Sequence, residues 1–248
     1  MKFIDRLSRR NLTVRDERPV IAVCLGDSVT HGCFDAFVDE RGDVGTVYAP
    51  AKGYAAQLER KLRALYPVAA GTVVNAGIGG DNAAGGLARL DRDVLSFKPD
   101  LVVINFGLND SMHPNFEEGL EMYRAAMRGM MRRVTESGAE CILLTPNFMC
   151  RYVSNALPDE RIRRIARSAA EIQNAGVLAA YVAAARREAA ELCVPVADAY
   201  ARWHTLSENS VDTTAMLSNF INHPTVEAHA IFVETLMDAL LFRAPVKG

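Results

Sequence analysis

The feature of this sequence that most constrains its fold is an alternation of short apolar runs with longer helical patterns. The runs are rich in β-branched residues and lie at 20–25, 72–75, 101–106, 141–145 and 194–196. Their hydrophobicity is nearly continuous, which is typical of strands covered on both faces. The helical patterns lie near residues 53–66, 84–97, 116–137, 159–173, 176–192 and 226–242. The alternation predicts an α/β fold: a three-layer α/β/α sandwich with a roughly five-stranded parallel sheet.

The chain of 248 residues fits one large domain, and half of its residues are hydrophobic, enough for a substantial core. We find no linker, repeat or low-complexity tract, so we expect a single domain over 1–248, with 1–18 as an N-terminal extension. Asn115 is expected to cap the 116–137 helix, and Ser137-Gly138 to end it. Residues 34–50 have weak periodicity and read as a long loop near the site.

Charge and composition exclude several classes of function. The formal net charge is −2, which gives no electrostatic footprint for nucleic acid or for an anionic membrane. The basic group Arg161, Arg163, Arg164 and Arg167 has the spacing of a solvated helix face. No secretory signal and no apolar stretch long enough to span a membrane is visible. The cysteines are five, scattered and without a CxxC pair, so we expect a cytoplasmic protein without disulfides.

Three polar, glycine-containing turns follow the first three predicted strands. They are Gly-Asp-Ser-Val-Thr at 26–30, Asn-Ala-Gly-Ile-Gly-Gly-Asp at 75–81 and Gly-Leu-Asn-Asp at 107–110. In open α/β sheets, ligands bind at the carboxyl ends of the strands. These turns are therefore expected to open on one edge of the sheet and to form the site.

Acyl transfer needs a nucleophile, a base and donors for the oxyanion, and each has a candidate here. Ser28 lies where a strand gives way to a turn. Gly80 lets its backbone N–H approach a substrate, and Asn109 offers an amide at the same edge. His223 precedes Pro224 on a loop near the C-terminal end. Each residue alone also has an ordinary interpretation, as a helix cap, a turn residue or a structural histidine; the combination carries the inference.

These blocks, in this order and spacing, resemble those of the SGNH, or GDSL-like, hydrolases over roughly residues 20–242. The resemblance implies a flavodoxin-like sandwich, Ser28 as nucleophile and His223 as base. It also implies an oxyanion hole formed by Gly80, Asn109 and the N–H of Ser28. This chemistry requires no cofactor and no metal.

The sequence departs from the family pattern at the third member of the triad. The family's acid usually lies three residues before the histidine, and that position is Phe220 here, with Asn219 and Asn222 nearby. A carboxylate could come from Asp212 or, behind it, Glu208. A backbone carbonyl could instead orient His223, leaving a Ser–His dyad, or the site could be inactive. Asp212 also reads as a turn residue beside Thr213.

The sequence therefore predicts a serine esterase or deacylase for small acyl esters, with acetyl or short-chain groups favoured because no lid-like apolar insertion is visible. The alternative is a non-catalytic carbohydrate- or ligand-binding module on a hydrolase fold. A dinucleotide-binding domain fits poorly, because 77–82 lacks the third glycine of G-x-G-x-x-G and follows the second strand. The five histidines show no metal-ligand spacing. We expect a small-molecule partner, no nucleic acid and no membrane; a homo-oligomer remains possible.

Overall fold

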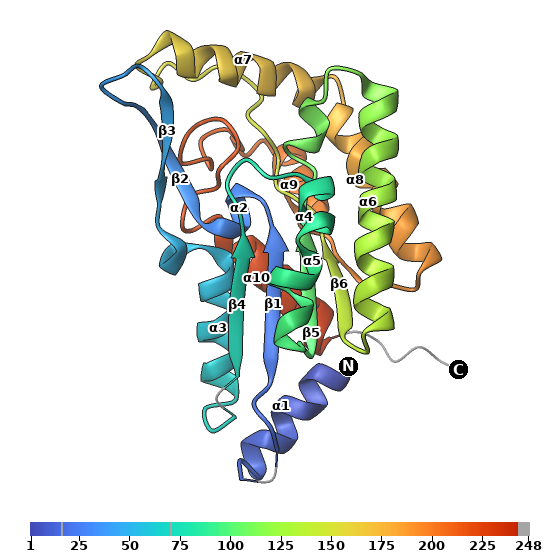
Figure 1. Ribbon diagram of the computed structural model, residues 1–248. Coiled ribbons are helices and arrows are strands. Elements are labelled where there is room, and N and C mark those ends of the chain that lie inside the picture. Colours follow the sequence, from blue (N-terminus) through green and yellow to red (C-terminus); the bar gives the residue numbers. More distant parts are fainter. Residues whose placement is uncertain (16, 70, 243–248) are drawn as a thin grey trace.

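A five-stranded parallel sheet forms the centre of the protein in a computed structural model that describes residues 1–15, 17–69 and 71–242 (Figure 1). The strands of this sheet are β1 (Ile21–Gly26), β4 (Thr72–Gly77), β5 (Leu101–Asn105), β6 (Glu140–Leu144) and β7 (Val196–Ala197). Their order is β4-β1-β5-β6-β7, and every neighbouring pair is parallel. The chain reverses its direction of winding between β1 and β5. This is the flavodoxin-like order, whose ligand sites lie at that switch point. The predicted fold class is confirmed.

Helices cover both faces of the sheet. They are α1 (Lys2–Leu12), α2 (Ser28–His31), α3 (Tyr54–Leu65), α4 (Ala83–Ala88), α5 (Leu90–Asp93), α6 (Phe116–Glu136), α7 (Glu160–Asn174), α8 (Val177–Glu191), α9 (Ala199–Glu208) and α10 (His229–Leu241). Short 3-10 turns lie at Pro50–Lys52, Leu95–Phe97 and Asp110–Met112. The α6 helix begins and ends as predicted: the Asn115 side chain accepts from Glu118 N, and Ser137 is the C-cap.

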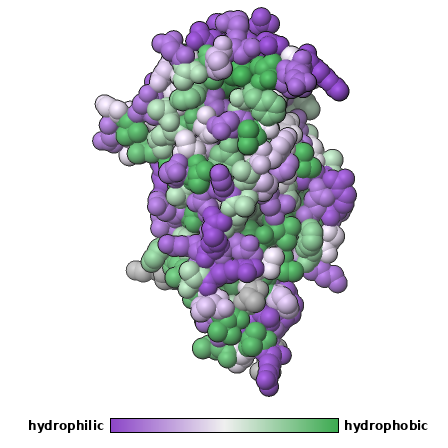
Figure 2. Space-filling view, turned by 90° about the vertical axis from the view of Figure 1, so that its left-hand side faces the viewer, coloured by the Kyte–Doolittle hydropathy of each residue, from purple (hydrophilic) through white to green (hydrophobic). Residues whose placement is uncertain are grey.

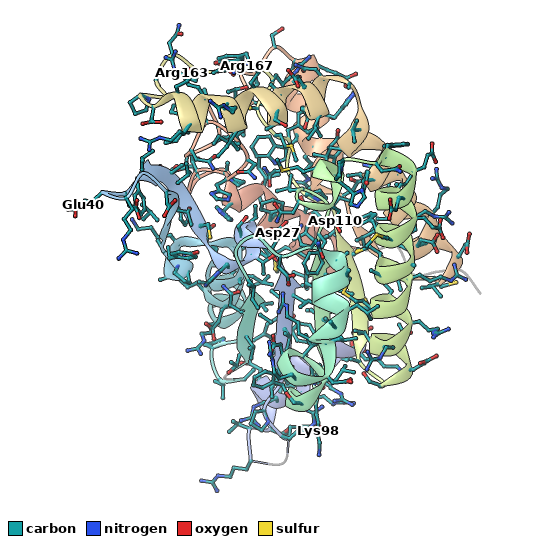
Figure 3. The ribbon with its side chains drawn as sticks, turned by 45° about the horizontal axis from the view of Figure 1, so that its top comes forward. Asp27, Glu40, Lys98, Asp110, Arg163 and Arg167 are labelled. Carbon is teal, nitrogen blue, oxygen red and sulfur yellow. The ribbon has the colours of Figure 1, made fainter. Side chains whose placement is uncertain are left out.

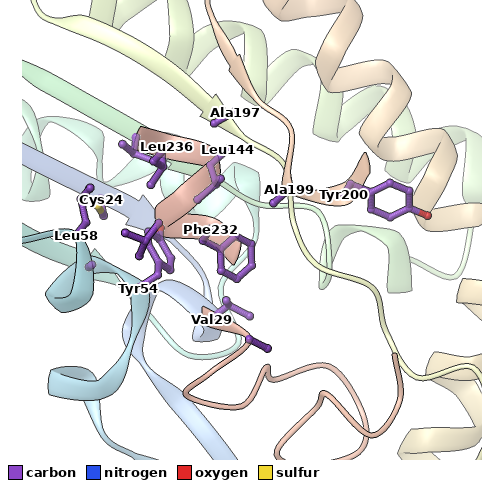
Figure 4. Packing of buried hydrophobic residues seen from close by; sticks show 14 of the residues in the cluster. Cys24, Val29, Tyr54, Leu58, Leu144, Ala197, Ala199, Tyr200, Phe232 and Leu236 are labelled. Atoms are coloured by element: carbon purple, nitrogen blue, oxygen red, sulfur yellow. The ribbon is translucent and has the colours of Figure 1, made fainter. Parts of the chain in front are cut away.

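Alternate residues of the strands supply two separate cores, as the period of a strand requires. On one face Cys24 and Val103 pack with residues of α3 and α10. On the other face Ile104 packs with residues of α4 and α6. Val29, the neighbour of Ser28, belongs to the first core together with Tyr54 and Phe232 (Figure 4). Packing of Val29 therefore anchors the short α2 helix at the carboxyl end of β1.

Three parts of the chain differ from the sequence-based expectation. Residues 34–50 are not a loop: β2 (Cys33–Val38) and β3 (Val44–Tyr48) form an antiparallel hairpin beyond the carboxyl end of the sheet. The helix expected at 84–97 is broken into α4, α5 and a 3-10 turn, with Arg89 between the two helices. The α9 helix was not predicted, because its pattern is short and only weakly amphipathic.

The surface agrees with the interpretation of the arginine group. Arg161, Arg164 and Arg167 are exposed on α7, and Arg163 is half-buried. Hydrophilic residues dominate the end of the molecule where α7 lies (Figure 2). Among the described residues, no helix is long and apolar enough to cross a membrane. In that same part of the chain, no group of three histidine, cysteine or acidic side chains is placed to hold a metal ion.

Candidate active site

The β1–α2 turn presents Ser28 at the switch point of the sheet. Asp27 caps α2 by accepting a hydrogen bond from Val29 N at 2.9 Å, so Ser28 is the first residue of the helix and not its cap. Gly26 makes the turn possible, because a Cβ there would lie 2.1 Å from Oγ1 of Thr30. Ser28 is 6% exposed, and it closely follows a strand that is buried from Ala22 to Gly26.

His223 meets Ser28 from a segment 195 residues away. Its Nε2 lies 3.0 Å from Oγ of Ser28, and its Nδ1 lies 2.8 Å from the carbonyl oxygen of Phe34 in β2. A carbonyl oxygen can only accept, so Nδ1 carries the proton of the neutral ring and Nε2 faces the hydroxyl as an acceptor. Burial lowers the pKa of His223, against the opposing effects of the Phe34 hydrogen bond and the Asp35 charge. The ring is thus a neutral base facing a serine hydroxyl.

The loop that carries His223 is held by the side chain of Asn219. Its Oδ1 accepts hydrogen bonds from the backbone N–H groups of Ile221, Asn222 and His223, at 2.9 to 3.0 Å. Asn147 Nδ2 donates to the Asn222 carbonyl at 2.9 Å. These bonds fix the backbone of the loop, and their side-chain partners are the amides of Asn219 and Asn147.

The structure corrects the candidate acids. The carboxylate of Asp212 is exposed and accepts hydrogen bonds from Tyr152 Oη at 2.6 Å and from the N–H groups of Thr214 and Ala215. Glu208 lies 3.2 Å from Nδ1 of His204 at the end of α9. Neither residue bonds His223, whose Nδ1 is already occupied. Asp212 is therefore a turn residue, the alternative that its place beside Thr213 in the sequence also indicates. The observed arrangement is a Ser–His pair whose histidine is oriented by a backbone carbonyl.

The two candidate oxyanion residues lie on turns that are bonded to each other. Asn109 Nδ2 donates to the carbonyl of Asp81 at 2.7 Å, which leaves its second amide hydrogen available. Gly80 has φ +78°, and nothing lies within 4 Å of the position that a Cβ would occupy. The neighbouring Gly79 N donates to Nδ1 of His31 in α2 at 3.1 Å, so this turn is also bonded to the helix that begins with Ser28.

Arg89 binds these turns from beneath the surface. Its guanidinium donates to the carbonyls of Gly26 in β1 and Ala76 in β4, at 3.0 and 2.7 Å. It also pairs with the carboxylate of Asp81 at 2.7 Å. Arg89 is 8% exposed, so it ties the ends of two strands to the Gly80 turn from a buried position. In the sequence it is one arginine in a helical pattern, which gives no signal of this role.

Two carboxyl groups lie on the turns that follow β1 and β5: Asp27 is buried and Asp110 is half-buried (Figure 3). Burial raises the pKa of Asp27 to about 7 and that of Asp110 to about 6. Asp110 accepts from Ala83 N at 2.9 Å, and the second oxygen of each carboxyl has no hydrogen-bond partner among the described residues. Charge on either group is thus unfavourable in the folded protein, which makes this region sensitive to pH near neutrality.

Comparison with known proteins relates this chain to a family of acyl hydrolases. The model of the GDSL-like lipase/acylhydrolase family matches residues 24–231. The chain is 33% identical over 132 residues to the acetylxylan esterase of Geobacillus stearothermophilus, a match that covers 50% of this chain and 58% of that protein. It is 40% identical over 85 residues to esterase TesA of Pseudomonas aeruginosa, which covers 33% and 41%. The matches thus span less than two thirds of these relatives.

A solved structure shows the same architecture over a longer span. The crystal structure of Axe2, an acetylxylan esterase from Geobacillus stearothermophilus, aligns with a TM-score of 0.65 at 22% identity. The alignment covers 90% of this chain and 95% of that one. At this identity the likeness concerns the fold, which agrees with the sheet order described above.

Proposed function

Because the chain belongs to the GDSL-like lipase/acylhydrolase family, we propose that the protein is a carboxylic-ester hydrolase that works through an acyl-enzyme on Ser28. The observation that carries the proposal is the 3.0 Å contact between Oγ of Ser28 and Nε2 of His223, with the ring oriented by the Phe34 carbonyl. A neutral imidazole in this tautomer can take the hydroxyl proton as the oxygen attacks.

Acylation begins with the attack of Oγ of Ser28 on the ester carbonyl carbon while Nε2 of His223 takes the hydroxyl proton. The new C–O bond pushes the carbonyl electron pair onto its oxygen. When this tetrahedral oxyanion collapses, the bond to the alkoxy group breaks and the leaving alcohol takes the proton from His223. The acyl group then remains on Ser28 as an ester, and the imidazole is neutral again.

Deacylation repeats the sequence with water as the nucleophile. His223 takes a proton from water as the water oxygen attacks the acyl carbon, and collapse breaks the bond to Oγ of Ser28. The serine oxygen takes the proton back, and the carboxylic acid leaves. In both halves the oxyanion would be held by the N–H groups of Ser28 and Gly80 and by the amide of Asn109, donors that act where the charge develops.

For the substrate, we propose acetyl or other short acyl esters, with a sugar as one candidate for the alcohol. The acetylxylan esterase among the relatives supports this choice. An exposed aromatic side chain also borders the Gly80 turn. The hydroxyl of Tyr48 lies 3.3 Å from where a Cβ on Gly79 would be, and the residue is 56% exposed. Such a ring offers a face against which a sugar can pack.

The test is hydrolysis of p-nitrophenyl acetate by the wild type and by Ser28→Ala under identical conditions. We expect activity in the wild type, its loss in the variant, and a decline of kcat/KM from acetate to octanoate esters. Acetylated xylo-oligosaccharides and acetylated short-chain alcohols then separate a sugar preference from a general one. Equal rates in the two proteins, or none in either, would contradict the proposal and favour the non-catalytic ligand-binding module.

A further inference from the structure

The hairpin contacts the catalytic histidine by two routes that form a closed ring. The first is the hydrogen bond between Nδ1 of His223 and the Phe34 carbonyl. The second starts one residue later, where the carboxylate of Asp35 accepts a hydrogen bond from Oγ of Ser218. The backbone N–H of Ser218 in turn donates to the carbonyl of His223 at 2.7 Å. Asp35 therefore links β2, whose Phe34 carbonyl orients the imidazole, to the loop that carries His223.

These contacts also bring the negative charge of Asp35 near the imidazole of His223. Three groups face His223 from the elements around it: Ser28 from α2, Asp35 from β2 and His229 from α10. His229 is neutral, since burial lowers its pKa to about 3 and its Nδ1 accepts from Tyr54 N. Asp35 is thus the carboxylate that acts on His223, and its charge favours the protonated ring.

Position 220, where the family usually carries its acid, holds a phenylalanine that lies against the hydrophobic core. Phe220 has φ +52°, and its side chain packs against the hydrophobic core together with that of Ile221. A carboxylate at 220 would be placed against apolar groups, whereas Asp35 reaches the loop from the hairpin and keeps contact with solvent.

We propose that Asp35 is a positioning residue for His223 and supplies, from the β2–β3 hairpin, the negative charge that position 220 lacks. The proposal rests on the proposed esterase function. Asp35 acts through another group: its bond to Ser218 keeps the Phe34 carbonyl aligned with Nδ1, and its charge stabilises the imidazolium that forms during acyl transfer. Because the carboxylate is exposed, salt screens the effect of its charge but not the alignment.

Two variants separate these contributions. Asp35→Asn removes the charge while its amide can still bond Ser218. Ser218→Ala removes the bond and keeps the charge. The matched control is Glu40→Gln, which removes a carboxylate from the outer end of the same hairpin (Figure 3). We expect Asp35→Asn to lower kcat on p-nitrophenyl acetate about tenfold with KM little changed, and Ser218→Ala to lower it severalfold.

The pH profile gives the result that a merely structural role would not produce. In Asp35→Asn the acid limb of kcat/KM should move to lower pH by about half a unit at low ionic strength, and this difference should shrink in 1 M salt. Ser218→Ala and Glu40→Gln should keep the wild-type limb. A profile of Asp35→Asn that coincides with that of Glu40→Gln in both height and position would overturn the proposal.

A readout without substrate keeps this test apart from that of the proposed function. The ring nitrogens of His223, followed by NMR through a pH titration, should show a lower pKa in Asp35→Asn than in the wild type. If the wild type hydrolyses no ester, the esterase proposal fails while this titration still decides whether Asp35 acts on His223. An unchanged His223 titration in Asp35→Asn rules out the proposed charge effect.

Discussion

The two halves of the Ser28–His223 pair are positioned in different ways. Ser28 and the Gly80 and Asn109 turns lie at the ends of β1, β4 and β5, so the buried sheet sets their places. His223 lies on a loop, and its place depends on hydrogen bonds to Asn219 and to the Phe34 carbonyl. The first half is fixed by the packed sheet, to which Arg89 ties the Gly80 turn, and the second by a polar network between distant segments. We therefore expect substitutions in the two halves to fail in different ways.

The largest effect is expected on the sheet side, at Asn109. Losing one oxyanion donor typically costs roughly 3–4 kcal/mol of barrier, so Asn109→Ala should lower kcat about a hundredfold or more. The fold should hold, because the site lies at the rim of the sheet. The neighbouring Asn82→Ala, which removes the cap of α4, is the control and should retain most activity. A loss of less than tenfold in Asn109→Ala would count against its role.

On the histidine side, Asn219→Ala should affect stability and activity together. It removes the acceptor of three backbone N–H groups, worth about 2–3 kcal/mol of unfolding free energy and a fall in Tm of about 5–10 °C. A loop released in this way should also lower kcat by about tenfold, because His223 is then less often aligned. Thermal melting and p-nitrophenyl acetate hydrolysis measure the two effects. Normal activity with a lowered Tm would show that the network does not position the histidine.

The buried acids give the sheet side a pH dependence. The folded protein raises the pKa of Asp27 to about 7, so folding favours its protonated form, and stability is lost as the pH rises from about 4 to about 7. Asn cannot ionise and still caps α2. Asp27→Asn should therefore be more stable than the wild type at pH 8 by roughly 2–4 kcal/mol, and nearly equal to it at about pH 4. Urea unfolding at the two pH values measures this, and the same difference at both would contradict it.

The smallest effect is expected at Asp212. Its carboxylate bonds Tyr152 and two backbone N–H groups and has no contact with His223. Asp212→Asn should leave kcat/KM within about twofold of the wild type, the size of change usual for a surface substitution of about 0.5 kcal/mol. A hundredfold loss would restore Asp212 as a third member of the site and would contradict the carbonyl-oriented pair.

The same division explains what the sequence could predict. Continuous apolar runs are typical of buried parallel strands, and Ser28, Gly80 and Asn109 lie on the turns that follow three of them. The sheet and its three turns could therefore be predicted from the sequence. The group that orients His223 could not be predicted, because the Phe34 carbonyl belongs to the backbone and any residue can supply one. It also lies in the segment expected to be a loop, where the alternation of the hairpin is too weak to predict a strand. Arg89 and Asn219 could not be predicted for the same reason, because each acts largely through backbone partners.

Covalent labelling of Ser28 by a fluorophosphonate, located by mass spectrometry, tests the central claim most directly. A serine reacts with this probe only when its hydroxyl is activated. We expect stoichiometric labelling of Ser28 in the wild type, strongly slowed labelling in His223→Ala, and labelling at the wild-type rate in Asp212→Asn. An unlabelled wild type, a label on another serine, or a rate independent of His223 would contradict it.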